Sequence, residues 1–240
     1  MCVQSSEWSR FIRETHKALA HIVKAGSLDT SGVLPTQADY DALIRGLGED
    51  LKTLTSKYAA GQISANDWAV GLDQLMLDAH TKSWKMGRNL AGNFADETEL
   101  DTLMGIAAKD VDGDRLLDFL KQIESGDARY FLEDGTVNTQ GILNRANMYL
   151  DRSRGTLNEA FIEKSDGGSL FTWTLGGVEE HCPDCPEIAA MGALPKDELI
   201  TTPGSCQTRC LTNCLCFLVR QDGVKGFELA GLDNGSDQAA

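Results

Sequence analysis

Apolar side chains recur at three- and four-residue intervals through most of the first 165 residues, which is typical of amphipathic helices. The spacing predicts helices over residues 5–24 and 36–61, and a third that begins at Ser64 and ends between residues 87 and 92. Thr36 with Asp39 resembles a capping arrangement, and Ser64 is a second candidate N-cap. The first half of the chain is therefore predicted to consist of helices joined by short loops.

The same periodicity continues beyond residue 98. A fourth helical stretch is predicted over residues 98–126 with a break near Asp112 and Gly113, and a fifth over residues 139–162. The fifth has one apolar side, formed by Ile142, Ala146, Tyr149, Leu150, Leu157 and Phe161. Tryptophans 8, 68 and 84 also follow helical faces, so we expect them to pack in the core.

The pattern changes after Gly167 and Gly168. Residues 170–175 favour a short strand, and beyond them cysteine, proline and glycine dominate. We expect a mainly α fold with three parts: a helical body over 1–165, a small Cys-rich zinc-binding module with short strands over 166–225, and a flexible tail over 226–240.

Composition narrows the function classes. The chain has 240 residues, 42% of them hydrophobic and 24% charged, as expected for a globular protein. No apolar run approaches the roughly 18 to 20 residues that a membrane span needs, so we expect no membrane partner. The N-terminus lacks the uninterrupted apolar stretch of a secretory signal, which predicts a cytoplasmic origin. A net charge of −14 argues against direct nucleic-acid binding.

Six of the seven cysteines fall between residues 182 and 216, first as C-P-D-C and later as C-L-T-N-C-L-C. A tetrahedral zinc ion takes four soft donors from two tight loops, and a two-residue spacing lets both thiolates of one loop face one ion. Cys182 and Cys185 fit that role. For the second pair we prefer Cys210 with Cys214, and Cys216 is the rival for the fourth position. The sequence thus predicts one structural Zn²⁺ per chain.

Two neighbours of this cluster have other expected roles. Cys206 follows a Pro-Gly pair and is either spare or a substitute for one of the other ligands, whereas His181 adjoins Cys182 and is awkwardly placed to bind the same ion. Disulfides are the weaker interpretation, because nothing exports the chain. A redox thiol pair would need an alternating strand–helix scaffold, and the preceding segments are nearly all helical.

No other segment predicts catalysis or a second metal site. Asp110, Asp112 and Asp114 resemble the start of a calcium loop, but Arg115 and Lys121 stand where that loop needs glycine and glutamate. His16, His21 and His80 lack metal-ligand spacing. The sequence contains no G-x-S-x-G, phosphate-binding glycine loop or H-E-x-x-H. We therefore expect a protein that is not an enzyme.

Residues 171–218 read FTWTLGGVEEHCPDCPEIAAMGALPKDELITTPGSCQTRCLTNCLCFL. This segment resembles the C-terminal part of phage minor head (head morphogenesis) proteins of the Mu-like type, which commonly show a tryptophan, a C-x-D-C, a Leu-Pro to Pro-Gly stretch and a cysteine cluster ending in C-x-C. The helical segments upstream extend the resemblance over roughly residues 51–218. Cys206 is extra, Leu215 occupies a site where arginine is frequent, and Cys210 lies near where some members carry histidine.

The resemblance implies a location in the virion, after assembly in the host cytoplasm. It implies a non-enzymatic assembly protein, a minor capsid component that contacts the portal, the major capsid protein or both. It leaves open whether each particle contains several copies. The alternative is a zinc-dependent regulatory adaptor that binds another protein outside the particle. The two differ in whether the protein associates with particles.

Overall fold

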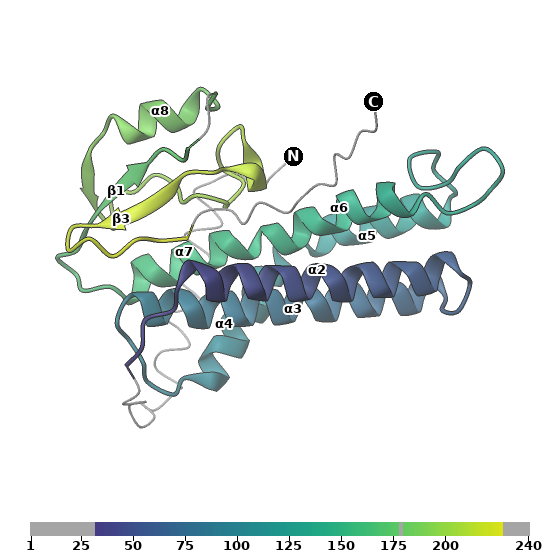
Figure 1. Cartoon of the computed structure of the whole chain (residues 1–240), viewed down its shortest axis with the longest axis horizontal. Coiled ribbons are helices and arrows are strands. Elements are labelled where there is room, and N and C mark those ends of the chain that lie inside the picture. Colours follow the sequence, from purple (N-terminus) through teal and green to yellow (C-terminus); the bar gives the residue numbers. More distant parts are fainter. Residues whose placement is uncertain (1–31, 178–179, 228–240) are drawn as a thin grey trace.

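The computed structural model describes residues 32–177 and 180–227. Long helices lie side by side, and a small sheet with one short helix lies beside them at one end of the molecule (Figure 1). The predicted class, mainly α with a small Cys-rich module and short strands, is confirmed. The helix predicted over 5–24, with Trp8, lies outside the described residues.

The first two long helices begin where the sequence predicts. α2 (Gln37–Ala59) and α3 (Ala65–Leu90) each start with a capping box, in which Thr36 pairs with Asp39 and Ser64 with Asp67. In each box the hydroxyl accepts the backbone N–H of the third helical residue, and that residue's carboxylate accepts the N–H of the cap. Otherwise these N–H groups would lack helical partners, so the boxes fix both helix starts.

The next two predicted helices also form, with one difference. α4 (Thr98–Asp110) and α5 (Gly113–Glu124) are separated at the predicted break. The stretch predicted as one helix over 139–162 is instead divided into α6 (Thr139–Asp151) and α7 (Ser153–Lys164), with a turn at Arg152. The residues of the predicted apolar side are all buried, but α7 buries its polar side as well, since every residue from Ser153 to Ile162 is buried.

The strands form one antiparallel sheet in the order β2-β1-β3. β1 (Leu170–Thr174) is central, flanked by β2 (Ala193–Pro195) and β3 (Phe217–Arg220). Phe171 pairs with Leu194 on one side and with Arg220 on the other. The short helix α8 (Asp184–Ala189) and the 3₁₀ turn η1 (Leu211–Asn213) complete the module. The sheet brings chain segments before and after the cysteines together.

One hydrophobic core lies entirely among the long helices. Trp68 is fully buried at its centre, donates to Thr55 Oγ1 at 3.1 Å and packs edge-on against Phe119. Its other buried members come from α2, α3, α5, α6 and the loop before α6: Leu47, Leu51, Leu72, Met76, Ala79, Leu116, Ile123, Tyr130, Ile142, Ala146, Tyr149 and Leu150. The expectation that Trp68 and Trp84 are core residues is confirmed.

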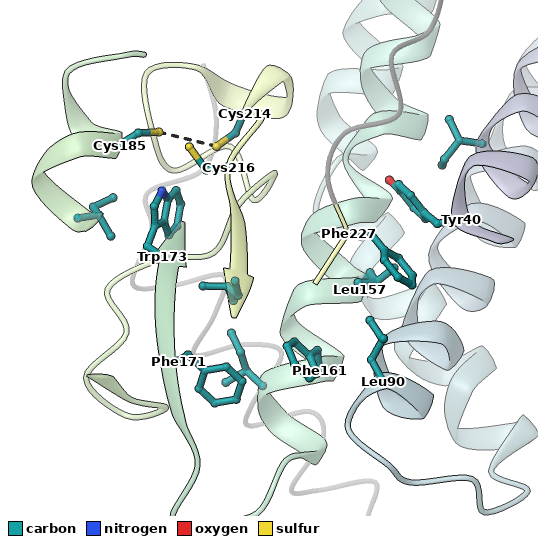
Figure 2. Close-up of a cluster of buried hydrophobic side chains, with 14 residues drawn as sticks. Tyr40, Leu90, Leu157, Phe161, Phe171, Trp173, Cys185, Cys214, Cys216 and Phe227 are labelled. Carbon is teal, nitrogen blue, oxygen red and sulfur yellow. Dashed lines mark hydrogen bonds between the residues drawn. The ribbon is translucent and has the colours of Figure 1, made fainter. Parts of the chain in front are cut away.

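A second core joins the helices to the module. Leu157 and Phe161 of α7 pack with Phe171 and Trp173 of β1, and Cys185, Cys214 and Cys216 belong to the same cluster (Figure 2). Phe227 stacks on Tyr40 of α2, with ring centroids 5.5 Å apart. The packed chain therefore extends two residues into the predicted tail. The division into separate domains stays a prediction. Among the described residues, no helix has the length and apolar character to cross a membrane.

Candidate metal centre

The cysteines of the module come from three short elements. Cys182 and Cys185 lie at the start of α8, where the N–H of Cys185 donates to the Cys182 carbonyl at 3.2 Å. Cys210 and Cys214 flank η1, and Cys216 immediately precedes β3. Because each thiol sits at the end of an element, several side chains converge without long loops.

Four of the sulfur–sulfur separations are close to those of a tetrahedral metal site. Cys182 Sγ lies 3.3 Å from Cys185 Sγ and 3.4 Å from Cys210 Sγ. Cys185 Sγ lies 3.6 Å from Cys210 Sγ and 3.8 Å from Cys214 Sγ. Four sulfurs around one zinc ion at about 2.3 Å stand roughly 3.8 Å apart. The cluster can therefore hold a metal ion.

The cluster contains five thiols, whereas a tetrahedral ion takes only four ligands. Cys182, Cys185 and Cys210 form one triad, and Cys185, Cys214 and Cys216 form a second, with the sulfurs of each triad within 4.8 Å of one another. Cys185 belongs to both. Figure 2 shows the sulfurs of the second triad gathered beside the Trp173 indole. Each of the four predicted ligands, and also the rival Cys216, belongs to at least one triad, but Cys182 and Cys214 share none.

The two other candidates lie at the margin. Cys206 is buried but belongs to neither triad, and its backbone has a φ of 66°. His181 is half-buried, with Nδ1 3.9 Å from Cys216 Sγ, and is also outside both triads. None of the six cysteines within the described residues is bonded in a disulfide. The antiparallel sheet differs from the alternating strand–helix scaffold that a thioredoxin-like pair requires.

The thiols differ in acidity. Hydrogen bonds, with that of Cys214 the strongest, lower the pKa of Cys210 and of Cys216 to about 5, against the opposing effect of burial. Burial raises the pKa of Cys185, and the hydrogen bond to Cys210 raises that of Cys214. Without a cation, some thiols therefore keep their protons. A bound dication would displace those protons and convert the ligands to thiolates.

Sequence reasoning missed the residues that hold these loops in place. Asp184, between the first two cysteines, accepts the backbone N–H of Arg209 at 2.7 Å and so ties the α8 loop to the η1 loop. Thr208 Oγ1 lies 3.1 Å from Cys210 Sγ. The C-x-D-C pattern singles out Asp184, but only the fold shows that its partner lies 25 residues away.

Helix α7 supplies the support underneath. Arg154 is fully buried and donates to the carbonyl oxygens of Cys214 and, at 3.4 Å, Cys216. Asn158 Nδ2 donates to the Pro203 carbonyl at 2.8 Å, and Glu159 Oε1 accepts from Thr202 Oγ1 at 3.2 Å. These bonds explain why α7 buries its polar side. Among helical positions, no local signal distinguishes such residues from solvated ones.

No family model, curated protein or solved structure matches this chain. The structure of the chain itself shows a five-cysteine cluster whose geometry can hold a metal ion.

Proposed function

We propose that this chain is a non-enzymatic structural protein of a phage head, which binds the portal or the major capsid protein and is stabilised by one zinc ion. The observation that carries the proposal is the convergence of five thiols within residues 182–216. This is the same segment whose tryptophan and cysteine pattern resembles the minor head proteins.

The donor chemistry supports zinc as the ion. The cluster offers soft thiolates at tetrahedral separations, and tetrahedral all-sulfur sites are typical of zinc or iron–sulfur centres. One zinc ion bound by Cys182, Cys185, Cys210 and Cys214, or with Cys216 as the fourth ligand, uses four of the five thiols. Four thiolates around Zn²⁺ carry a net charge of about −2. The buried guanidinium of Arg154 against the Cys214 carbonyl offsets part of that charge.

The ion's role in this scheme is structural. Strands β1, β2 and β3 contain five, three and four residues, too few to form a stable sheet without other packing. Zinc joins the α8 loop to the η1 loop, and β1 then packs its buried side on α7. Metal binding would thus supply folding energy to a module that buries little apolar area by itself.

The partner is a protein rather than packaged nucleic acid. The chain carries a net charge of −14, so a nucleic-acid backbone would repel most of its surface. Contacts with the portal or capsid protein, through the helical body, would therefore determine its place in the particle.

The test is a count of this chain in purified, nuclease-treated particles by quantitative mass spectrometry. It is paired with pull-downs against the portal and major capsid proteins of the same particles. We expect a fixed number of copies per particle and direct binding to one of the two proteins. Elemental analysis of protein purified without added metal should give about one zinc per chain.

Absence from particles at every assembly stage, with no binding to either protein, would refute the head-protein proposal. That result, with zinc still present, would favour the regulatory adaptor. A well-folded protein without bound metal would instead refute the zinc site and leave the assembly role to be judged by the particle count.

A further inference from the structure

A small cavity lies where α5 and α6 meet the module, and no thiol of the two triads lines it. Its volume is about 60 Å³, and its polar lining comes from Asp112, Arg115, Arg145, Arg152 and Thr212. A single water needs roughly 10–15 Å³ measured in this way. The cavity therefore has room for a group of several heavy atoms.

The charge inside this cavity is opposite to that of the whole protein. Three guanidinium groups face one carboxylate in a chain of net charge −14. Asp112 Oδ1 accepts from Arg115 at 3.2 Å and from Arg152. Arg145 lies over the Tyr149 ring at 5.4 Å and takes part in none of the ion pairs found among the described residues. The lining thus carries a net positive charge.

Two buried polar atoms at this cavity lack hydrogen-bond partners among the described residues. They are Asp112 Oδ2 and Thr212 Oγ1, and their residues are only 1% and 2% exposed. Burial raises the pKa of Asp112 in spite of the arginines nearby, so its carboxylate is incompletely compensated. Leaving such a group unpaired costs about 1–3 kcal/mol. Both atoms would be satisfied by a ligand that donates and accepts hydrogen bonds.

We propose that this cavity binds a small tetrahedral oxyanion of the phosphate class that keeps at least one proton. Its charged oxygens accept from Arg145 and Arg115, as oxyanions do from guanidinium groups. Its P–OH donates to Asp112 Oδ2, and a further oxygen accepts from the Thr212 hydroxyl. A fully deprotonated anion would place an acceptor against the Asp112 carboxylate and would be repelled.

The position of the site gives the ligand a structural consequence. Arg115 and Arg145 belong to α5 and α6, whereas Thr212 belongs to η1 of the module. Cys206 and Leu211, which also line the cavity, are the two non-glycine residues of the described chain with positive φ, at 66° and 56°. A bound anion would join the helices to this loop in addition to the contacts that α7 makes.

The test titrates the metal-loaded full-length protein with sodium phosphate at pH 7, at constant ionic strength set with sodium chloride. Thermal unfolding and calorimetry should both show saturable binding, because a ligand of the folded state raises the unfolding temperature. Sulfate has the same shape but no proton at this pH, so it should bind at least several-fold more weakly.

Variant Arg145→Gln removes a charge that the Asp112 ion pairs do not use, so the protein should fold normally while its phosphate affinity falls roughly tenfold or more. Thr212→Val, which removes only the hydroxyl, should also weaken binding. Arg45→Gln, on the exposed side of α2, is the control for net charge and should bind as the wild type does.

Absence of saturable phosphate binding by the wild type would overturn the proposal. Equal phosphate affinity in the Arg145→Gln, Arg45→Gln and wild-type proteins would also overturn it, since any stabilisation would then be a general salt effect. Sulfate binding as tight as phosphate would refute the role assigned to the ligand's proton. None of these results depends on zinc identity or on particle association.

Discussion

The helical region, α2 to α7, and the Cys-rich module, residues 166–225, reach order by different means. The helical region contains a core made wholly of its own apolar side chains, with Trp68 at the centre. The module has short strands, and its apolar residues share a core with Leu157 and Phe161 of α7. Apolar burial can account for the first. The Cys-rich module also needs its packing on α7 and bonds that join its own loops.

Two helices show the same contrast on a smaller scale. α5 buries only Leu116, Phe119 and Ile123, and turns charged side chains to solvent. α7 buries ten consecutive residues, because the module covers the side that would otherwise face water. Arg154 and Asn158 of α7 bond to module backbone, whereas Thr156 contacts His80 of α3, so α7 is the element on which both regions depend.

Substitution of a metal-binding cysteine should show the difference in stability between the two regions most clearly. We expect Cys185→Ser, which alters the thiol common to both triads, to abolish zinc binding and unfold the module while most helical signal remains. Structural zinc sites contribute on the order of 10 kcal/mol. Hydrogen exchange should show early opening of residues 166–225 and continued protection of α2 and α3, and chelation should reproduce it.

Cys206→Ser is the matched control for that experiment, because Cys206 is buried in the same module but lies outside both triads. It should keep its zinc and lose much less stability. Equal damage from the two substitutions would show that the ligand set is wrong.

Arg154→Met should produce the next largest effect. The substitution keeps much of the buried volume but leaves the carbonyls of Cys214 and Cys216 without their guanidinium donor, at about 1–3 kcal/mol for each unpaired group. We expect faster transfer of zinc to a competing chelator and a lower unfolding temperature. Arg129→Gln, at an exposed ion pair, is the control and should change neither. An unchanged zinc-transfer rate in Arg154→Met would contradict the supporting role of α7.

Gly155→Ala tests the contact between α7 and the module. A Cβ at this position would lie 2.9 Å from Ser205 Cα and 3.0 Å from the Gly204 carbonyl, so backbone must move. We expect a loss of about 1–3 kcal/mol in the free energy of unfolding. Gly46→Ala, where nothing lies within 4 Å, should instead stabilise α2 by about 0.5–1 kcal/mol. Denaturant titration compares them, and similar shifts would mean that α7 is not tightly covered.

The smallest expected effect concerns acid stability of the helical region. Burial lowers the pKa of His80 from 6.5 to about 3, and its Nδ1 lies 2.7 Å from Thr156 Oγ1. Between these pH values the unfolded chain binds a proton at His80 that the folded protein does not. The contribution of His80 to the free energy of unfolding is therefore complete above pH 6.5 and falls as pH decreases. From pH 6.5 to 5.5 the loss is about 1 kcal/mol. His80→Asn should show a flatter stability profile over that interval, and identical slopes would contradict the burial of a neutral imidazole.

Much of this arrangement could be predicted from the sequence, because the signals are local. The capping residues Thr36 and Ser64 marked helix starts, and the spacing of Cys182 and Cys185 marked one half of a metal site. The turn at Arg152 and the burial of Phe227 were not predictable in this way. Both residues contact segments far away in the chain, Arg152 through its bond to Asp112 and Phe227 through its stacking on Tyr40.

The sequence by itself determined most of the helices, the strand at β1 and the set of cysteines, since periodicity, caps and spacing act over a few residues. Only the tertiary structure decided which sulfurs meet, because Cys182 and Cys210 are 28 residues apart and their 3.4 Å separation depends on how α8 and η1 dock. It also decided that Arg154, Asn158 and Glu159 are buried. A polar side chain shows no local sign of whether water or another part of the chain will satisfy its hydrogen bonds.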